Sequence, residues 1–311
     1  EVETFGIDES WIELTGSPLL KERTPHEIAD EIRNTVKSEV GLTVSIGISF
    51  NKIFAKLGSD MKKPDAVTEI GRDTFRDQVW PLPVSDLLYV GRATAEKLGR
   101  YCIRTIGDLA NTERDILRSL LGINGEKIWA YANGLDASRV MPCDYTPPIK
   151  SIGHGITCTA DLVSESEVRG VFLELSQDIG LKLRKQGLAA NGVRITVRDN
   201  TLSHRQYQCK LPFPTQSYLE IYDAGIDMFH RRYSWSNNIR SLTISAIDLI
   251  SADTPVQLDL WTDMSKHKRR IRLEETIEDI RRRFGLHAIN FAAAGSMKIP
   301  VQSDIEYKMP S

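Results

Sequence analysis

Short strand patterns and helical patterns alternate over residues 1–80. Apolar and polar residues alternate on both sides of the polar turn 6–10, which predicts a β-hairpin. Thr24 and Pro25 are typical of a helix cap and a first helical residue, and apolar side chains then recur every four residues up to Gly41. The later patterns predict a buried strand over 42–48, a short helix over 51–57 and a strand from 66. This order of elements is typical of half of a split βαβ sheet.

Residues 81–140 read as short helices joined by turns that contain glycine. Two of these turns, 88–93 and 120–125, each precede an amphipathic helix. The N–H groups at such a helix N-terminus can hold a phosphate oxygen without reading base sequence. An ordinary turn between two helices is the alternative for each of them.

A linker with three prolines, Pro142–Pro148, separates this region from a second sheet pattern. The alternating strands of that pattern predict one sheet face covered by helices and one free face. Its βαββαβ order comprises strand 151–159, helix 164–184, strands 191–198 and 203–211, helix 216–232 and strand 240–250. A polar tail extends from about 253, with a basic run at 266–270 and then a helix over 271–284.

The composition is that of a soluble globular protein of two or three domains. The 311 residues are 41% hydrophobic and 26% charged, and no apolar run approaches the roughly 18 residues of a membrane helix. The four cysteines are far apart, which argues against a structural zinc site and a disulfide framework, and favours a reducing cytoplasm. Because the chain starts at Glu1 without a signal peptide, we expect that a segment precedes it or that it was cut.

The net charge of −2 is distributed unevenly along the chain. Residues 1–80 carry −5, residues 81–146 carry 0, residues 147–252 carry +2 and residues 253–311 carry +1. An acidic centre that holds cations, followed by parts that touch phosphate, fits this distribution. Random scatter of surface charge is the alternative.

Two groups of residues in the first segment carry candidate chemistry. Asp8 and Glu9 sit at the hairpin tip, where a distorted turn would let both approach one metal ion. Hard cations bridged by carboxylates are typical of phosphoryl transfer. Asn51, Lys52 and Lys63 come after a predicted buried strand, at the end of a sheet where ligands commonly bind. The alternatives are a solvated turn and a solvated helix face.

Several blocks of sequence resemble the Y-family (DinB/UmuC-type, ImpB/MucB/SamB) translesion DNA polymerases. The palm signature is the longest of them, and the likeness extends over about the first 260 residues. The blocks are 5–10 and 41–52 with 55–56, 59–60 and 63–64 for the palm, 90–98 and 105–110 for a helix-hairpin-helix thumb, 150–154 for the entry to the little finger, and 257–261 for a peptide that docks the replication sliding clamp.

The resemblance implies template-directed addition of a deoxynucleotide by a two-metal mechanism. Asp8 matches the family's metal-ligating aspartate and Glu9 its neighbour, and the implied cofactor is two Mg²⁺ ions, with Mn²⁺ as an alternative. Lys63 matches the lysine that touches the incoming dNTP, and Asn51 and Lys52 match positions near it.

The resemblance also implies primer-template DNA and the sliding clamp as partners, and a monomeric, cytoplasmic bacterial protein associated with the nucleoid. In the thumb, Gly91 and Ala93 would present backbone to primer phosphates. Strand position alone makes Arg194, Arg198, Arg205 and Lys210 candidate template contacts on the free sheet face. The clamp peptide would bind through Gln257, Leu258, Leu260 and Trp261.

The expected fold is therefore α+β and multidomain. Its parts are a partial palm with a split βαβ sheet over 1–80, a helix-hairpin-helix thumb over 81–141, a linker over 142–149, a βαββαβ little finger over 150–252, and a clamp-binding tail with a C-terminal helix over 253–311.

The sequence departs from the family pattern in two places. Gly6 replaces the usual serine beside Asp8. The family's first metal-ligating aspartate, its steric-gate aromatic residue and its fingers have no counterpart in positions 1–311, so we expect this chain alone to be inactive or nearly so. The alternative function is a non-catalytic module that binds primer-template DNA and the clamp. A nucleotide cyclase is disfavoured, because it needs neither thumb hairpins nor a clamp peptide.

Overall fold

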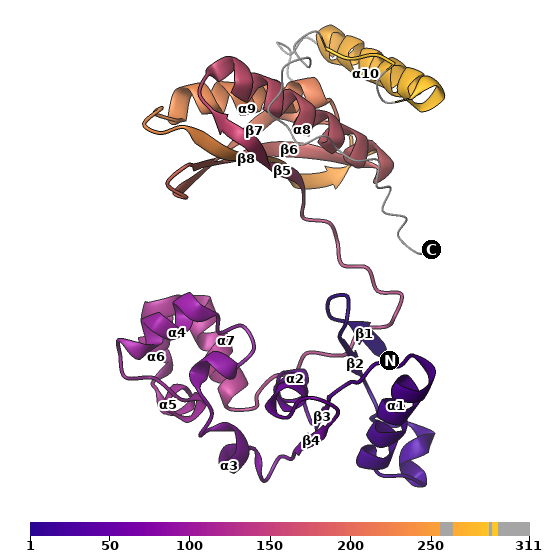
Figure 1. The fold of residues 1–311 in the computed structure, drawn as a ribbon, viewed down its shortest axis with the longest axis vertical. Helices are drawn as coiled ribbons and strands as arrows, with labels where there is room; N and C mark the ends of the chain where they lie inside the picture. The colour runs from indigo at the N-terminus through magenta and orange to yellow at the C-terminus, as the bar shows by residue number, and fades with distance from the viewer. Residues whose placement is uncertain (256–263, 286–287, 292–311) are drawn as a thin grey trace. The chain divides into compact units, whose positions relative to one another are not determined.

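The computed structural model describes residues 1–255, 264–285 and 288–291, and they fall into two compact units. Unit 1 comprises residues 1–146 and unit 2 begins at residue 147. The division falls inside the proline-rich segment. Figure 1 shows the helices and strands of both units.

Unit 1 begins with two small sheets joined by a helix. The hairpin and the helix agree with the sequence prediction, since β1 pairs with β2 in antiparallel fashion and Thr24 and Glu27 form a capping box on α1. The elements are β1 (Val2–Thr4), β2 (Ser10–Ile12), a 3-10 turn (Pro18–Lys21), α1 (Pro25–Glu39), β3 (Ile46–Ser49), α2 (Lys52–Met61) and β4 (Val67–Ile70), with β3 parallel to β4.

The strand predicted over 42–48 is wrong in its start and in its burial. It begins at Ile46, its residues are half-buried, and the side chain of Leu42 is 62% exposed. Within the described part of the chain, residues 42–45 have no strand partner, so their β-branched composition alone does not hold them in a sheet. The close approach of α2 to β3 depends on Gly47, because a Cβ there would overlap the backbone of Ala55.

The rest of unit 1 is helical and shares a core with α2 and β4. Phe54 and Ile70 belong to the same buried cluster as Leu98, Ile106 and Leu117. The helices are α3 (Phe75–Val79), α4 (Arg92–Gly99), α5 (Ile106–Asn111), α6 (Arg114–Leu121) and α7 (Ile123–Ala132), with a 3-10 turn at Val84–Asp86. One continuous core therefore fixes α2, β4 and the helical region relative to one another.

Unit 2 has the βαββαβ order that the sequence pattern predicts. Its four strands form one antiparallel sheet in the order β5-β8-β6-β7, and α8 and α9 cover one face of it (Figure 1). The elements are β5 (Ser151–Leu162), α8 (Glu165–Lys185), β6 (Leu188–Asp199), β7 (His204–Thr215), α9 (Tyr218–Arg232) and β8 (Ile239–Ser251). The core lies between helices and sheet, and within unit 2 none of the described helices covers the other sheet face.

The C-terminal helix α10 (Met264–Phe284) starts earlier than predicted. The basic run 266–270 was expected to precede the helix, but it forms the first turns. Two reasons are visible. Lys and Arg are good helix formers, and α10 packs on α8 and α9 mainly through polar contacts, so an apolar stripe does not mark its start. Across the described residues, α10 and the other helices are too short or too polar to cross a membrane.

Candidate active site and nucleic-acid surfaces

The hairpin tip presents the two candidate catalytic carboxylates. The N–H of Phe5 donates to the carbonyl of Glu9 over 2.8 Å and closes the turn. Gly6, where the resemblance implies a serine, adopts a φ of 85°, in the left-handed region that favours glycine. Asp8 is exposed, and Glu9 is half-buried against α2.

Lys56 of α2 connects the hairpin to the end of that helix. Its Nζ lies 2.9 Å from Oε1 of Glu9 and 2.7 Å from Oδ2 of Asp60. Burial lowers the pKa of Lys56, but the hydrogen bonds to Asp60 and Glu9 outweigh it, so the pKa is raised and the ammonium group stays charged. Two carboxylates from different elements are therefore held by one half-buried cation.

Lys63 joins the same line of charges. Its Nζ lies 2.8 Å from Oδ1 of Asp60, while its side chain remains 57% exposed. Burial raises the pKa of Asp60, but the hydrogen bonds from Lys56 and Lys63 outweigh it and the pKa is lowered. The structure thus brings together Glu9 and Lys63, two of the predicted site residues, through Lys56 and Asp60.

The other two predicted nucleotide-binding residues make structural contacts. Oδ1 of Asn51 accepts from the N–H of Phe54 over 2.8 Å and caps α2. Nζ of Lys52 lies 2.6 Å from Oε1 of Glu3 and 4.2 Å from the centre of the Trp11 ring. Lys52 therefore holds the hairpin to α2, and its partner is 49 residues away in the sequence, beyond the reach of any spacing argument.

The residues present do not form a complete metal site by themselves. Among residues 1–255, 264–285 and 288–291, no three His, Cys, Asp or Glu side chains are grouped so that they could hold one ion. The hairpin supplies two adjacent carboxylates, and one of them is already paired with Lys56. A Mg²⁺ ion at this tip would take its remaining oxygen ligands from water, substrate phosphates or a further carboxylate.

Two turns in the helical region leave helix N-termini open. Gly91 precedes α4 and Gly122 precedes α7, and among the described residues no side chain caps either helix. Gly91 and Ala93 are both exposed, and a Cβ at Gly91 would meet no atom within 4 Å. Lys97 of α4 donates to the carbonyl of Leu120, so the end of α4 is tied to the second turn. The free N–H groups of the two turns suit phosphate oxygens.

The uncovered face of the sheet in unit 2 is largely polar. Its side chains alternate with the core residues along each strand, and the pairing register places them side by side. The polar part of the face is built from Gly153, Gly155, Thr157, Ser241, Thr243, Ser245, Arg194, Thr196, Arg198, His204, Gln206, Gln208 and Lys210.

This free face has one part with little side-chain bulk, on β5, and one cationic part, on β6 and β7. On β5 a Cβ at Gly153 would overlap Ser245, and one at Gly155 would overlap Thr243, so the strand shows bare backbone. On β6 and β7 stand Arg194, Arg198 and Lys210. A surface of this kind can approach a sugar-phosphate backbone closely and neutralise it.

Arg205 does not belong to the free face. It pairs with Val197, a core residue, and its Nη1 lies 3.3 Å from Oγ of Ser234 on the helix-covered side. Period-two alternation along β7 separates Arg205 from Lys210, and counting positions from Lys210 would have shown this. Sequence reasoning also missed Gln206 and Gln208, which are on the face because the strand pairs with β6. The predicted clamp residues Gln257, Leu258, Leu260 and Trp261 lie outside the described residues.

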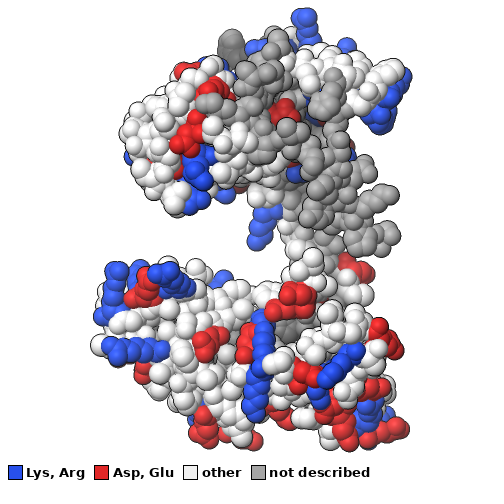
Figure 2. Space-filling model, viewed as in Figure 1, with Lys and Arg blue, Asp and Glu red and all other residues white. Residues whose placement is uncertain are grey.

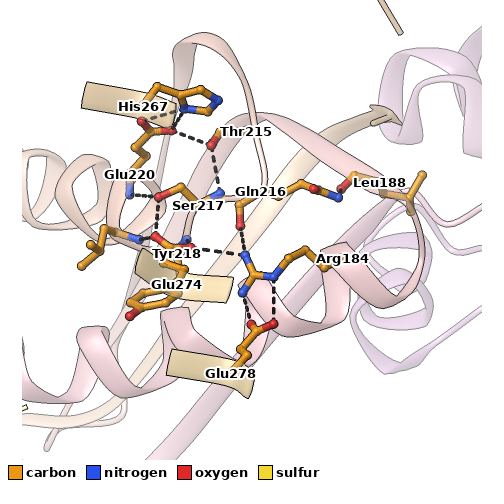
Figure 3. A network of polar contacts seen from close by, with 11 residues as sticks. Arg184, Leu188, Thr215, Gln216, Ser217, Tyr218, Glu220, His267, Glu274 and Glu278 are labelled. Atoms are coloured by element: carbon orange, nitrogen blue, oxygen red, sulfur yellow. Dashed lines mark hydrogen bonds and ion pairs between the residues drawn. The ribbon is translucent and has the colours of Figure 1, made fainter. Parts of the chain in front are cut away.

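Within unit 2, a buried polar network joins α10 to α8 and to the start of α9 (Figure 3). The Glu274 carboxylate is fully buried and accepts from Oγ of Ser217 at 2.5 Å and from the N–H groups of Tyr218 and Leu219 at 3.0 and 3.2 Å. It therefore caps the N-terminus of α9 from another helix. Burial raises the pKa of Glu274, while these donors and Arg184 act in the opposite direction.

Comparisons with known proteins agree with the geometry of both units. Models of the impB/mucB/samB family and of its C-terminal domain match residues 1–60 and 149–260. The DNA polymerase IV of Acetivibrio thermocellus is 41% identical over 288 residues, which are 93% of this chain and 72% of that protein. The DNA polymerase IV of Clostridium kluyveri is 33% identical, over 91% of this chain and 72% of that protein.

A solved structure shows the same fold at lower identity. The Y-family DNA polymerase chimera Dbh-Dpo4(243-245)-Dbh superposes with a TM-score of 0.65 at 19% identity, over 80% of this chain and 71% of that chain. The mixed α/β architecture is thus shared where the sequence has diverged. Taken with the impB/mucB/samB matches and the polymerase relatives, this shows that the chain belongs to the Y family of DinB/UmuC-type DNA polymerases.

Proposed function

We propose that this chain contributes to template-directed DNA synthesis past lesions, the reaction of a DNA-directed DNA polymerase. The proposal rests on a chain of ion pairs, Glu9–Lys56–Asp60–Lys63. These pairs connect the carboxylates at the hairpin tip to the exposed Lys63 after α2. A phosphoryl-transfer centre needs carboxylates near the reacting oxygens and cations near the triphosphate. The polymerase relatives support the same function.

Lys56 has a positioning role in this proposal. It fixes the carboxylate of Glu9 against α2, while Asp8 is exposed at the tip. Lys63 provides a charge of the sign that an incoming dNTP requires, and Asp60 orients it. Divalent metal ions, when bound, supply the activation of the primer hydroxyl. Because the described residues do not complete a metal site, we propose that the 311-residue chain alone is inactive or nearly so.

Primer extension tests both parts of this proposal. The purified chain is compared with a fusion in which the N-terminal segment of the Acetivibrio thermocellus relative precedes Glu1, each with Mg²⁺, dNTPs and a template carrying an abasic site. We expect extension by the fusion only, and its loss in the fusion with Asp8→Asn. Extension by the chain alone would refute its inactivity, and a folded fusion without extension would refute the polymerase assignment.

We assign DNA binding to two surfaces, one in each unit. In unit 1 the open helix N-termini at Gly91 and Ala93 bind primer phosphates, and in unit 2 Arg194, Arg198 and Lys210 bind the template backbone. Arg205 is not in this set, because it lies on the helix-covered side. These surfaces also carry the second candidate function, a non-catalytic primer-template module, which the lack of a complete metal cluster within the described ranges favours.

The clamp peptide completes the proposal. A glutamine, two leucines and a tryptophan at 257–261 suit a small apolar pocket on a ring-shaped clamp. Leu260→Ala with Trp261→Ala should abolish clamp binding in surface plasmon resonance and leave DNA affinity within about twofold. Unchanged clamp binding by this variant would refute the assignment.

A further inference from the structure

The N-terminal half of α10 presents an unpaired cationic face. His267, Arg270 and Glu274 point inward, to Glu220, Asp223 and the N-terminus of α9. Figure 2 shows Lys and Arg side chains at the surface of the region where α10 lies. Four exposed side chains there have no hydrogen-bond or salt-bridge partner in the described part of the chain: Lys266, Lys268, Arg269 and Arg272.

Helix stability does not account for this cluster. The macrodipole favours acids in the first turn and cations in the last turn, and the first turn of α10 has no acid. In the C-terminal half, by contrast, Arg282 and Arg283 both pair with Asp279. Lys266, Lys268 and Arg269 therefore oppose the dipole with no paired acid among the described residues, as expected of a surface that meets an external anionic partner.

The position of α10 in unit 2 distinguishes DNA from other anionic partners that its cationic face could bind. The helix packs on α8 and α9, which cover one face of the sheet, whereas the candidate DNA contacts lie on the other face. DNA on the free face is therefore separated from α10 by the thickness of the unit. Trp261 precedes Lys268 by seven residues, a span of at most about 25 Å, so a partner that holds 257–261 lies next to this surface.

We propose that Lys268, Arg269 and Arg272 contact an acidic surface of the clamp beside the pocket that receives residues 257–261. This inference rests on the proposed clamp function and adds a second, electrostatic contact to it. Charges at the rim of an interface act mainly on the association rate and depend on ionic strength. The cationic face would thus steer the peptide toward its pocket.

A matched pair of charge reversals tests this surface. Lys268→Glu with Arg269→Glu and, as control, Arg282→Glu with Arg283→Glu change the net charge equally on the same helix. Binding to the purified sliding clamp of the source organism is measured by surface plasmon resonance at about 50 and about 500 mM NaCl. We expect the first pair to lower the association rate about 5- to 20-fold at the lower salt and less than about twofold at the higher salt. The control should stay within about twofold at both.

The outcomes separate this inference from the clamp assignment. If wild type binds the clamp, Leu260→Ala with Trp261→Ala does not, and both charge reversals keep the wild-type rate, the clamp assignment stands and the cationic contact is refuted. A loss of DNA affinity with unchanged clamp association would make α10 a DNA contact and also refute it. No clamp binding by wild type overturns both. Should a Glu variant unfold, Lys268→Gln with Arg269→Gln repeats the test.

Discussion

At the residue scale, three lysines that follow the same strand in the sequence make different contacts in the structure. Lys52, Lys56 and Lys63 all come after the same strand, yet only Lys56 connects Glu9 to Asp60. Lys52 is taken up by Glu3, whose position is set by the hairpin fold. The motif predicted the neighbourhood of the site, whereas the pairings depend on contacts between elements 47 to 49 residues apart.

Gly47 gives a residue-scale prediction about packing. A Cβ at this position would overlap the Ala55 backbone, whereas one at Gly99 meets no atom within 4 Å. Gly47→Ala should lower the free energy of unfolding of unit 1 by about 1–3 kcal/mol. Gly99→Ala, the control, should be neutral or stabilising by up to about 1 kcal/mol. Urea denaturation measures both, and equal values for the two variants would contradict the close approach of α2 and β3.

Asp65 gives a prediction about pH. Hydrogen bonds from Lys37 and Arg33 lower the pKa of Asp65. A lowered pKa in the folded state contributes stability above the ordinary pKa, and this contribution is lost as the pH falls through the lowered value. Asp65→Asn should therefore melt at a lower temperature than wild type at about pH 7, with the difference closing below about pH 4. A difference that stays constant down to about pH 3 would contradict the ion pairs.

At the element scale, the sequence predicted well the helices that have capping residues and the strands that have alternating apolar residues. It failed where tertiary contacts determine the start of an element. The capping boxes Thr24–Glu27 and Ser164–Glu167 are visible as residue pairs, and α1 and α8 begin there. The start of α10 is not visible in this way, because its inward residues are polar and their partners are on other helices. The late start of β3 has a related cause, since residues 42–45 lack a strand partner among the described residues.

Glu274 gives the element-scale prediction. Glu274→Ala removes the acceptor for Ser217 and for two N–H groups at the start of α9 and leaves them buried. Unit 2 should lose about 3 kcal/mol of stability, and the amides of α10 should exchange with solvent faster. The exposed neighbour Glu275 is the control, and Glu275→Ala should change little. Unchanged hydrogen exchange in Glu274→Ala would show that the network does not hold α10.

At the scale of the whole molecule, the net charge and the local arrangement of charge differ. A net charge of −2 argues against DNA binding, yet unit 2 places Arg194, Arg198 and Lys210 on one side of a sheet. The free face was predictable from the βαββαβ order, because helices that connect strands in this way cover a single face. Its members were not fully predictable, because alternation separates Arg205 from Lys210 but only the pairing of β7 with β6 shows that Lys210 is the one on the side of Arg198.

The central claim is that this chain holds primer-template DNA on the free face of unit 2. Fluorescence anisotropy of a labelled primer-template over about 50–400 mM NaCl tests it most directly, with wild type, Arg198→Ala and Arg205→Ala. We predict salt-dependent binding, a fall of about 0.7–0.9 in the slope of log K against log salt for Arg198→Ala, and almost no change for Arg205→Ala. Absence of salt-dependent binding by wild type, or equal effects of the two substitutions, would contradict the claim.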